Sequence, residues 1–240
     1  MKPNTRLTKT FIGLTSVAAI ASTVYAGWTS HTLHASYAVA LLMLAAVTSR
    51  MKVKLPGIDG NMSMNLPFLL LAVVNLSAIE AVGIACVSTA VQCWPKPGSK
   101  FRPEQMLFNI SMMAFATSMA NLIWNAGWLG KTAWASEPLM LASTTVAFFL
   151  GQTAPVAGII KLAEGAAMRT IWKSIAQLSF PYYVVSAGLT SMTNLVSHHL
   201  GWQAALVIFP VMYGIHRSYH LYFHRAEPTP VLMRTASAGA

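Results

Sequence analysis

Residues 66–94 read LPFLLLAVVNLSAIEAVGIACVSTAVQCW and contain a single charged side chain, Glu80. The stretch is too long for one helix across a bilayer, since a spanning helix needs about 20 apolar residues. We therefore expect a helical hairpin that turns near Ser77–Glu80. Each arm then has about 14 residues and a length of about 21 Å, shorter than a hydrocarbon core of about 30 Å. Two interpretations stay open: the arms cross obliquely where the membrane is thinned, or the hairpin re-enters without crossing.

Six further apolar runs flank this stretch. They are Phe11–Trp28, Ala35–Thr48, Gln105–Trp124, Pro138–Ile160, Ile175–Ser197 and Trp202–Ile215. The first run resembles the apolar part of a signal peptide, but a second run follows closely, so we expect the first to be retained as a helix. We predict an all-α, polytopic membrane bundle of about eight membrane segments, with six full spans and the short hairpin. Residues 1–225 are expected to form this single domain, and residues 226–240 a short disordered cytoplasmic tail.

The composition supports a membrane protein and predicts its orientation. Only 9% of the residues are charged, against about 25% in soluble domains, which excludes a soluble enzyme and a soluble nucleic-acid-binding domain. The net charge is +10, and fifteen of the sixteen Lys and Arg residues, all except Lys131, lie at alternate junctions between the apolar runs. Because short cytoplasmic loops carry the excess of Lys and Arg, we expect both termini to be cytoplasmic in a multi-pass protein of the inner membrane. The charge therefore indicates topology and does not indicate a nucleic-acid partner.

Polar side chains within the apolar runs are the candidate ligand-binding residues. Asn75, Asn109 and Gln152 lie in predicted helices, and Glu80 lies at the predicted turn. Amide groups in membrane helices either hydrogen-bond one helix to another or line a pocket between helices. Both roles stay open for these four residues.

No catalytic centre is predicted. The sequence contains no HExxH motif and no glycine-rich phosphate-binding loop, and its six carboxylates are scattered. His216, His220 and His224 recur every four residues, which places them on one face of a helix. With the neighbouring Tyr and Arg residues they are typical of an interfacial belt, and metal or haem ligation is the alternative. We expect no cofactor and no enzymatic activity.

Several short motifs follow one another in an order that resembles a known family. They are Lys54-Leu55-Pro56-Gly57, Met62-Ser63-Met64-Asn65, Val91-Gln92-Cys93, Arg102-Pro103, Phe108-Asn109, Gln152-Thr153, Pro155-Val156-Ala157, Glu164-Gly165, Trp172, Phe180-Pro181-Tyr182-Tyr183 and Arg217-Ser218-Tyr219-His220-Leu221-Tyr222. Together they resemble the multi-helix membrane module at the N-terminus of bacterial cyclic-dinucleotide signalling proteins. In that family the module precedes a diguanylate cyclase (GGDEF) or HD-type phosphohydrolase domain. Neither motif occurs in these 240 residues, so the resemblance implies a sensory or anchoring module without the family's catalytic activity.

We expect a non-catalytic integral membrane protein that binds a small ligand and signals through partner proteins. Arg217 and Tyr219 are then placed at its output end, next to a cytoplasmic signalling partner. Two alternatives remain: the substrate-binding membrane component of a transporter, with an ATPase partner, and an accessory subunit of a larger membrane complex. Each is compatible with a homo-oligomer in the lipid bilayer.

Overall fold

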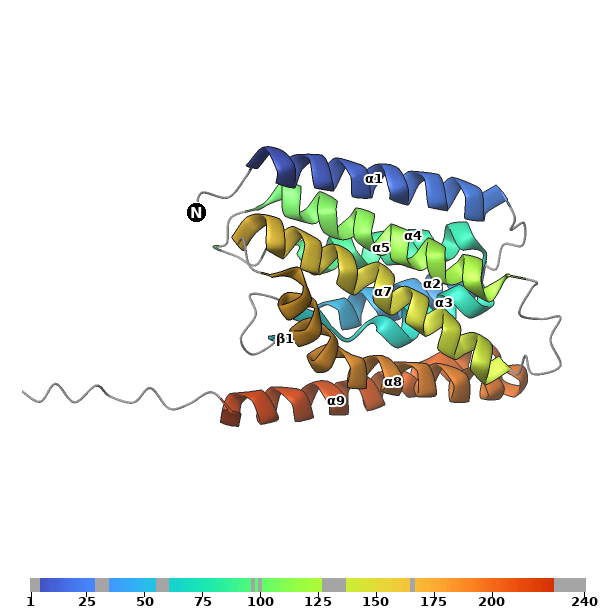
Figure 1. Cartoon of the computed structure of the whole chain (residues 1–240). Helices are drawn as coiled ribbons and strands as arrows, with labels where there is room; N and C mark the ends of the chain where they lie inside the picture. The colour runs from blue at the N-terminus through green and yellow to red at the C-terminus, as the bar shows by residue number, and fades with distance from the viewer. Residues whose placement is uncertain are drawn as a thin grey trace, which may run out of the picture.

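The computed structural model describes residues 5–28, 35–54, 61–95, 98, 101–126, 137–164 and 167–226. Within these residues the chain forms eight α-helices that pack as a bundle, together with a two-stranded sheet (Figure 1). The predicted helical class is confirmed. The elements are α1 (Thr5–Trp28), α2 (Ala35–Ser49), β1 (Lys52–Lys54), β2 (Asn61–Ser63), α3 (Leu66–Asn75), α4 (Ala78–Cys93), α5 (Pro103–Trp124), α7 (Glu137–Glu164), α8 (Met168–Leu200), the 3-10 helix η1 (Gly201–Gln203) and α9 (Ala204–Ala226).

Helix α3 is the core of the bundle. It contacts α2, α4, α5 and α8, and its residues from Leu66 to Val73 are all buried. A helix that is apolar on every side is stable where other elements surround it. Pro67 stands in the first turn, where its missing N–H interrupts no helical hydrogen bond. The first arm of the 66–94 stretch is thus the element around which the other helices pack.

The α3–α4 hairpin turns at Leu76 and Ser77, within a residue of the predicted turn. The Ser77 hydroxyl accepts a hydrogen bond from the Glu80 N–H at 3.3 Å, and the Glu80 carboxylate accepts one from the Ser77 N–H at 3.0 Å. This reciprocal arrangement is a capping box, which satisfies two backbone donors at the start of α4. Glu80 therefore has a structural role at the turn.

Helix α4 runs the length of the bundle. At one end, a Cβ added to Gly27 of α1 would lie 3.1 Å from Cγ1 of Ile79 in α4. At the other end lies Arg50, the residue after α2. Its guanidinium donates hydrogen bonds to the carbonyls of Val91 and Trp94 at 3.0 and 3.2 Å. The two arms are unequal, with 16 residues in α4 and 10 in α3, whereas arms of equal length were expected.

A β-hairpin, which was not predicted, precedes α3 in the chain. Strands β1 and β2 pair antiparallel with Val53 opposite Met62, and Val53 is buried. The Ser63 hydroxyl at the end of β2 donates to Oε1 of Gln92 at 3.3 Å, so β2 packs against the last turn of α4.

Three helices are long and apolar enough to cross a membrane, and they agree with a membrane location. These segments are Arg6–Trp28, Pro103–Trp124 and Glu137–Leu162. Helices α2, α3 and α4 are apolar but shorter, and α8 and α9 are long but less apolar. By length and composition, the described helices thus include fewer full spans than the six expected. The outer face of α1 is itself apolar, since Leu14, Val17, Ile20 and Val24 are each 63 to 66% exposed.

The basic residues of the described chain lie at or near one end of the bundle. In Figure 1 this end, on the left, holds the start of α1, the end of α7, the start of α8 and the end of α9. The Lys9 ammonium lies 3.2 Å from the Glu104 carboxylate. This ion pair joins the start of α1 to the start of α5. The described Lys and Arg residues are Arg6, Lys9, Arg50, Lys52, Lys54, Arg102, Lys161, Arg169, Lys173, Arg217 and Arg225. We call this the basic end; Lys131, expected at the opposite end, lies outside the described residues, as do residues 227–240 of the predicted tail.

Helices α8 and α9 form a second hairpin along one side of the bundle. Helix α8 changes direction part-way along its length (Figure 1), and Pro181 inside it removes a helical hydrogen bond, which is the usual cause of such a bend. Gly201 ends α8 with φ of 62° and ψ of −149°, a conformation that is open almost only to glycine. This glycine allows the chain to reverse into α9.

Candidate ligand-binding groove

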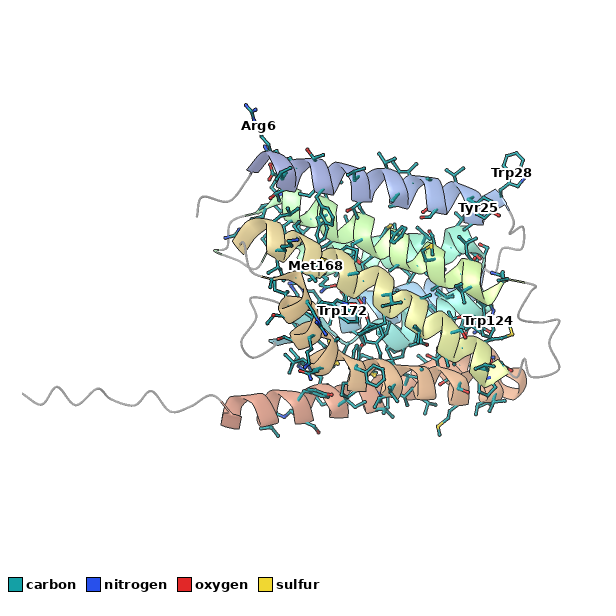
Figure 2. All side chains as sticks on the ribbon, in the orientation of Figure 1. Arg6, Tyr25, Trp28, Trp124, Met168 and Trp172 are labelled. Carbon is teal, nitrogen blue, oxygen red and sulfur yellow. The ribbon has the colours of Figure 1, made fainter. Side chains whose placement is uncertain are left out.

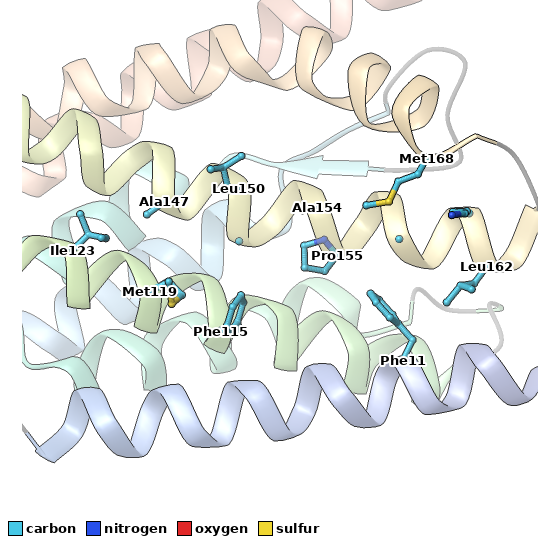
Figure 3. A pocket seen from close by; sticks show the side chains of 13 residues that line it. Phe11, Phe115, Met119, Ile123, Ala147, Leu150, Ala154, Pro155, Leu162 and Met168 are labelled. Carbon is cyan, nitrogen blue, oxygen red and sulfur yellow. The ribbon is translucent and has the colours of Figure 1, made fainter.

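A groove of about 720 Å³ lies between α5 and α7. Its lining residues come from four helices and are Phe11, Phe115, Met119, Ile123, Ala147, Leu150, Gly151, Ala154, Pro155, Gly158, Lys161, Leu162 and Met168 (Figure 3). Phe11 of α1 and Met168 of α8 line the part of the groove nearer the basic end. We call this hollow the α5–α7 groove.

Small residues on one face of α7 create the groove. Gly151, Ala154 and Gly158 follow one another at intervals of three and four, which places them on one face of the helix. A Cβ added to Gly151 would lie 3.0 Å from the Cα of Ala116 in α5, and a Cβ added to Gly158 would lie 2.9 Å from Cζ of Phe11 in α1. The two glycines therefore bring α5 and α1 close to α7, and the short side chain of Ala154 leaves space between the helices.

The groove is apolar and opens towards the outside of the bundle. Leu150 is 45% exposed and Met168 is 41% exposed, so both lie on its open side. Among the described residues of the lining, Lys161 is the one that carries a charge, and it is exposed at the basic end. An amphipathic molecule therefore meets an apolar channel with a positive charge at one end.

The opposite face of α7 holds α8. The Tyr183 hydroxyl of α8 donates a hydrogen bond to Oε1 of Gln152, and the Trp172 indole N–H donates to the Thr153 hydroxyl at 3.2 Å. The Tyr183 ring packs edge-on against Phe149 at a centroid distance of 4.9 Å. Figure 2 shows Trp172 beside α7 near the start of α8. Helix α7 thus lines the groove with one face and is bonded to α8 through the other.

The four predicted ligand-binding residues lie at two levels of the bundle. Gln152 also donates to Sδ of Met113 at 3.3 Å, one helical turn from Asn109, which donates to Sγ of Cys93 at 3.2 Å. Asn75 lies near the opposite end, by the hairpin turn, where its amide donates to the carbonyl of Leu71 in its own helix at 3.1 Å. Glu80 caps α4 at the same turn. The structure therefore brings Asn109 near Gln152 but places Asn75 and Glu80 elsewhere, and none of the four lines the groove.

The predicted output residues lie in the last helix. Arg217 is exposed and Tyr219 is half-buried against the core, both in the half of α9 nearer the basic end. His216 is half-buried in the same stretch, and the side chains of His220 and His224 lie outside the described residues. Within the described residues, no three His, Cys, Asp or Glu side chains are placed to hold a metal ion.

The groove and Lys161 were not identified from the sequence. A signal was present, because the spacing of Gly151, Ala154 and Gly158 marks a small-residue face on α7. The sequence does not say which helices pack against that face, and this decides whether it is filled or hollow. Comparison with protein-family models, with curated proteins and with solved structures finds no match for this chain.

Proposed function

We propose that the chain is a multi-pass protein of the inner membrane, with about eight membrane segments and both termini in the cytoplasm. The collection of basic residues at one end of the bundle supports this orientation, because cytoplasmic loops carry the excess of Lys and Arg. The hairpin contributes two short segments: at about 1.5 Å per residue, the 10 residues of α3 and the 16 of α4 span about 15 and 24 Å, less than a hydrocarbon core of about 30 Å.

In this membrane the protein binds a small amphipathic ligand in the α5–α7 groove and catalyses no reaction. A volume of about 720 Å³ falls within the range of about 300–1,000 Å³ for small-molecule sites. Three glutamates already have structural partners: Glu80 in the cap of α4, Glu104 with Lys9, and Glu137 as acceptor from the Asn194 amide. These pairings support a binding protein over an enzyme.

The contacts made by the two faces of α7 are the observation that supports a sensory role. A ligand in the groove touches Gly151 and Ala154, while the adjacent Gln152 and Thr153 bond to α8. Packed helices respond to a ligand by small rigid shifts, so occupancy of the groove changes the position of α8. Helix α8 continues through the turn at Gly201 into α9, whose exposed Arg217 is the proposed contact for a cytoplasmic partner. This arrangement fits the resemblance to sensory membrane modules.

The test is to identify small molecules that remain bound to the purified protein. Ala154→Phe places a large side chain in the groove, and Val146→Phe, on the same helix at an exposed position outside the lining, is its matched control. Native mass spectrometry of protein released from detergent micelles is expected to show a near-stoichiometric bound molecule in the wild type and in Val146→Phe, and its loss in Ala154→Phe. A wild-type protein that carries no bound molecule, or equal retention in all three proteins, would contradict the proposal.

A further inference from the structure

We propose that the α5–α7 groove holds an acyl chain of an anionic phospholipid from the cytoplasmic leaflet, with the lipid phosphate at Lys161. This inference rests on the proposed function and names the chemical class of its ligand. It needs a site with the depth of one leaflet, access from the bilayer and a positive charge at the level of the head groups.

The depth fits one leaflet. From Lys161 to Ala147 the lining of α7 spans fourteen residues, or about 21 Å of helix at about 1.5 Å per residue. This exceeds half of a hydrocarbon core of about 30 Å, so the groove is long enough for one acyl chain below its head group. A lipid with its phosphate at Lys161 therefore places the end of its chain near Gly151.

The lining and the open side of the groove suit an acyl chain. Apart from Lys161, the described residues that line the groove are apolar, as the chain of a lipid requires. The exposed side chains of Leu150 and Met168 flank the open side, so a lipid enters from the bilayer without crossing water.

The charge at the basic end favours an anionic head group. Lys161 is the charged residue of the lining, and Arg169 directly follows the lining residue Met168. The nearby Glu104 carboxylate is paired with Lys9 at 3.2 Å, which neutralises its charge. The cytoplasmic leaflet is rich in anionic lipids, which attract Lys and Arg near the membrane surface. A head group with a net negative charge is therefore bound more tightly here than a zwitterionic head group.

The experiment uses the full chain in mixed micelles that contain equal amounts of phosphatidylglycerol and phosphatidylcholine with the same acyl chains. Native mass spectrometry counts the lipids that each protein retains. We compare the wild type with Lys161→Gln and with Lys173→Gln, which removes an exposed positive charge from α8 outside the lining. Wild type and Lys173→Gln are expected to retain phosphatidylglycerol about tenfold over phosphatidylcholine, and Lys161→Gln about twofold or less.

A second measurement locates the lipid in the wild-type protein and does not depend on the folding of any variant. Phosphatidylglycerol with a diazirine at the end of one acyl chain is cross-linked by light, and the labelled peptides are expected to include Leu150–Ala154 of α7 and the facing part of α5. Labelling spread evenly over the outer face of α1, or no preference between the two head groups, would overturn the inference. If both lipids are retained equally and still label the groove, the proposed function stands and the anionic ligand does not. If no molecule is retained or labelled in the groove, both fail.

Discussion

The Tyr183 hydroxyl donates a hydrogen bond to Oε1 of Gln152 and so joins α8 to α7 on the side of α7 that faces away from the α5–α7 groove. Tyr183 is buried, and its ring also packs against Phe149. Because a buried hydroxyl without an acceptor is costly, this contact fixes the two helices in one relative position. It links α7, which lines the groove, to the α8–α9 hairpin.

Gln152→Leu is expected to lower the free energy of unfolding by about 1–2 kcal/mol, since the Tyr183 hydroxyl loses its acceptor in a buried site. Tyr183→Phe is expected to cost a similar amount. The double variant should cost less than the sum of the two, because residues in one hydrogen bond are coupled. The measurement is unfolding in a titration with sodium dodecyl sulfate, followed by circular dichroism. Additive costs would show that the two side chains do not interact.

Ser77→Ala removes the side chain that caps α4. The expected loss of stability is about 1 kcal/mol, within the range of about 0.5–2 kcal/mol for helix N-caps. The same unfolding titration measures it. Ser143→Ala is the control, since Ser143 is exposed and bonds to the carbonyl of Leu139 in its own helix. Equal stability of the two variants would exclude a capping role for Ser77.

Gly201→Ala is expected to destabilise the α8–α9 turn by about 1–3 kcal/mol, because almost only glycine adopts this backbone conformation without strain. Gly188→Ala, inside α8, is the control. No described atom lies within 4 Å of a Cβ added to Gly188, and alanine is preferred over glycine in a helix by about 1 kcal/mol. Thermal unfolding in detergent is expected to move the melting temperature down for the first variant and not for the second. A tolerant Gly201 would contradict the turn described for this position.

Gly151→Ala tests the close approach of α5 and α7. The added Cβ would lie 3.0 Å from the Cα of Ala116, and a main-chain atom cannot rotate away, so the helices must separate. Overpacking of this kind costs about 1–3 kcal/mol. Gly83→Ala in α4, where no described atom lies within 4 Å of the added Cβ, is expected to be neutral or stabilising. If Gly151→Ala and Gly83→Ala have the same free energy of unfolding, α5 and α7 are farther apart than described.

The sequence was sufficient for the elements whose signal is local. The long apolar runs predicted the helices. The turn at Leu76–Ser77 lies within a residue of its predicted position, because Ser77 and Glu80, which form the cap, are only three residues apart in the sequence. Equal arms were wrong because the Ser77 cap starts α4 at Ala78, before the middle of the 66–94 stretch. The β-hairpin was missed because strands of three residues, such as Lys52–Lys54, are too short to leave a periodic pattern. Their packing against Gln92 depends on contacts between distant parts of the chain.

The candidate site depended on which helices are neighbours. Gln152 was selected as an isolated amide, and its partner Tyr183 lies on another helix, so the sequence could not distinguish a link between helices from a pocket residue. The groove residues are apolar and resemble any other helix surface. In the sequence, Lys161 was one of many basic residues that together indicated the membrane topology. Only the packing of α1, α5 and α7 distinguishes it from the others.

The membrane orientation is tested by labelling single cysteines in intact cells. Both native cysteines, Cys86 and Cys93, are replaced by alanine, and Trp28→Cys or Phe101→Cys is added. Trp28 is 82% exposed and points away from the bundle at the end of α1 (Figure 2), whereas Phe101, 52% exposed, precedes α5 at the basic end. A membrane-impermeant maleimide is predicted to label the cysteine at position 28 in intact cells and the one at position 101 only after permeabilisation. Labelling of both positions from the same side, or the reverse pattern, would contradict a bundle that crosses the inner membrane with Lys161 and the basic end in the cytoplasm.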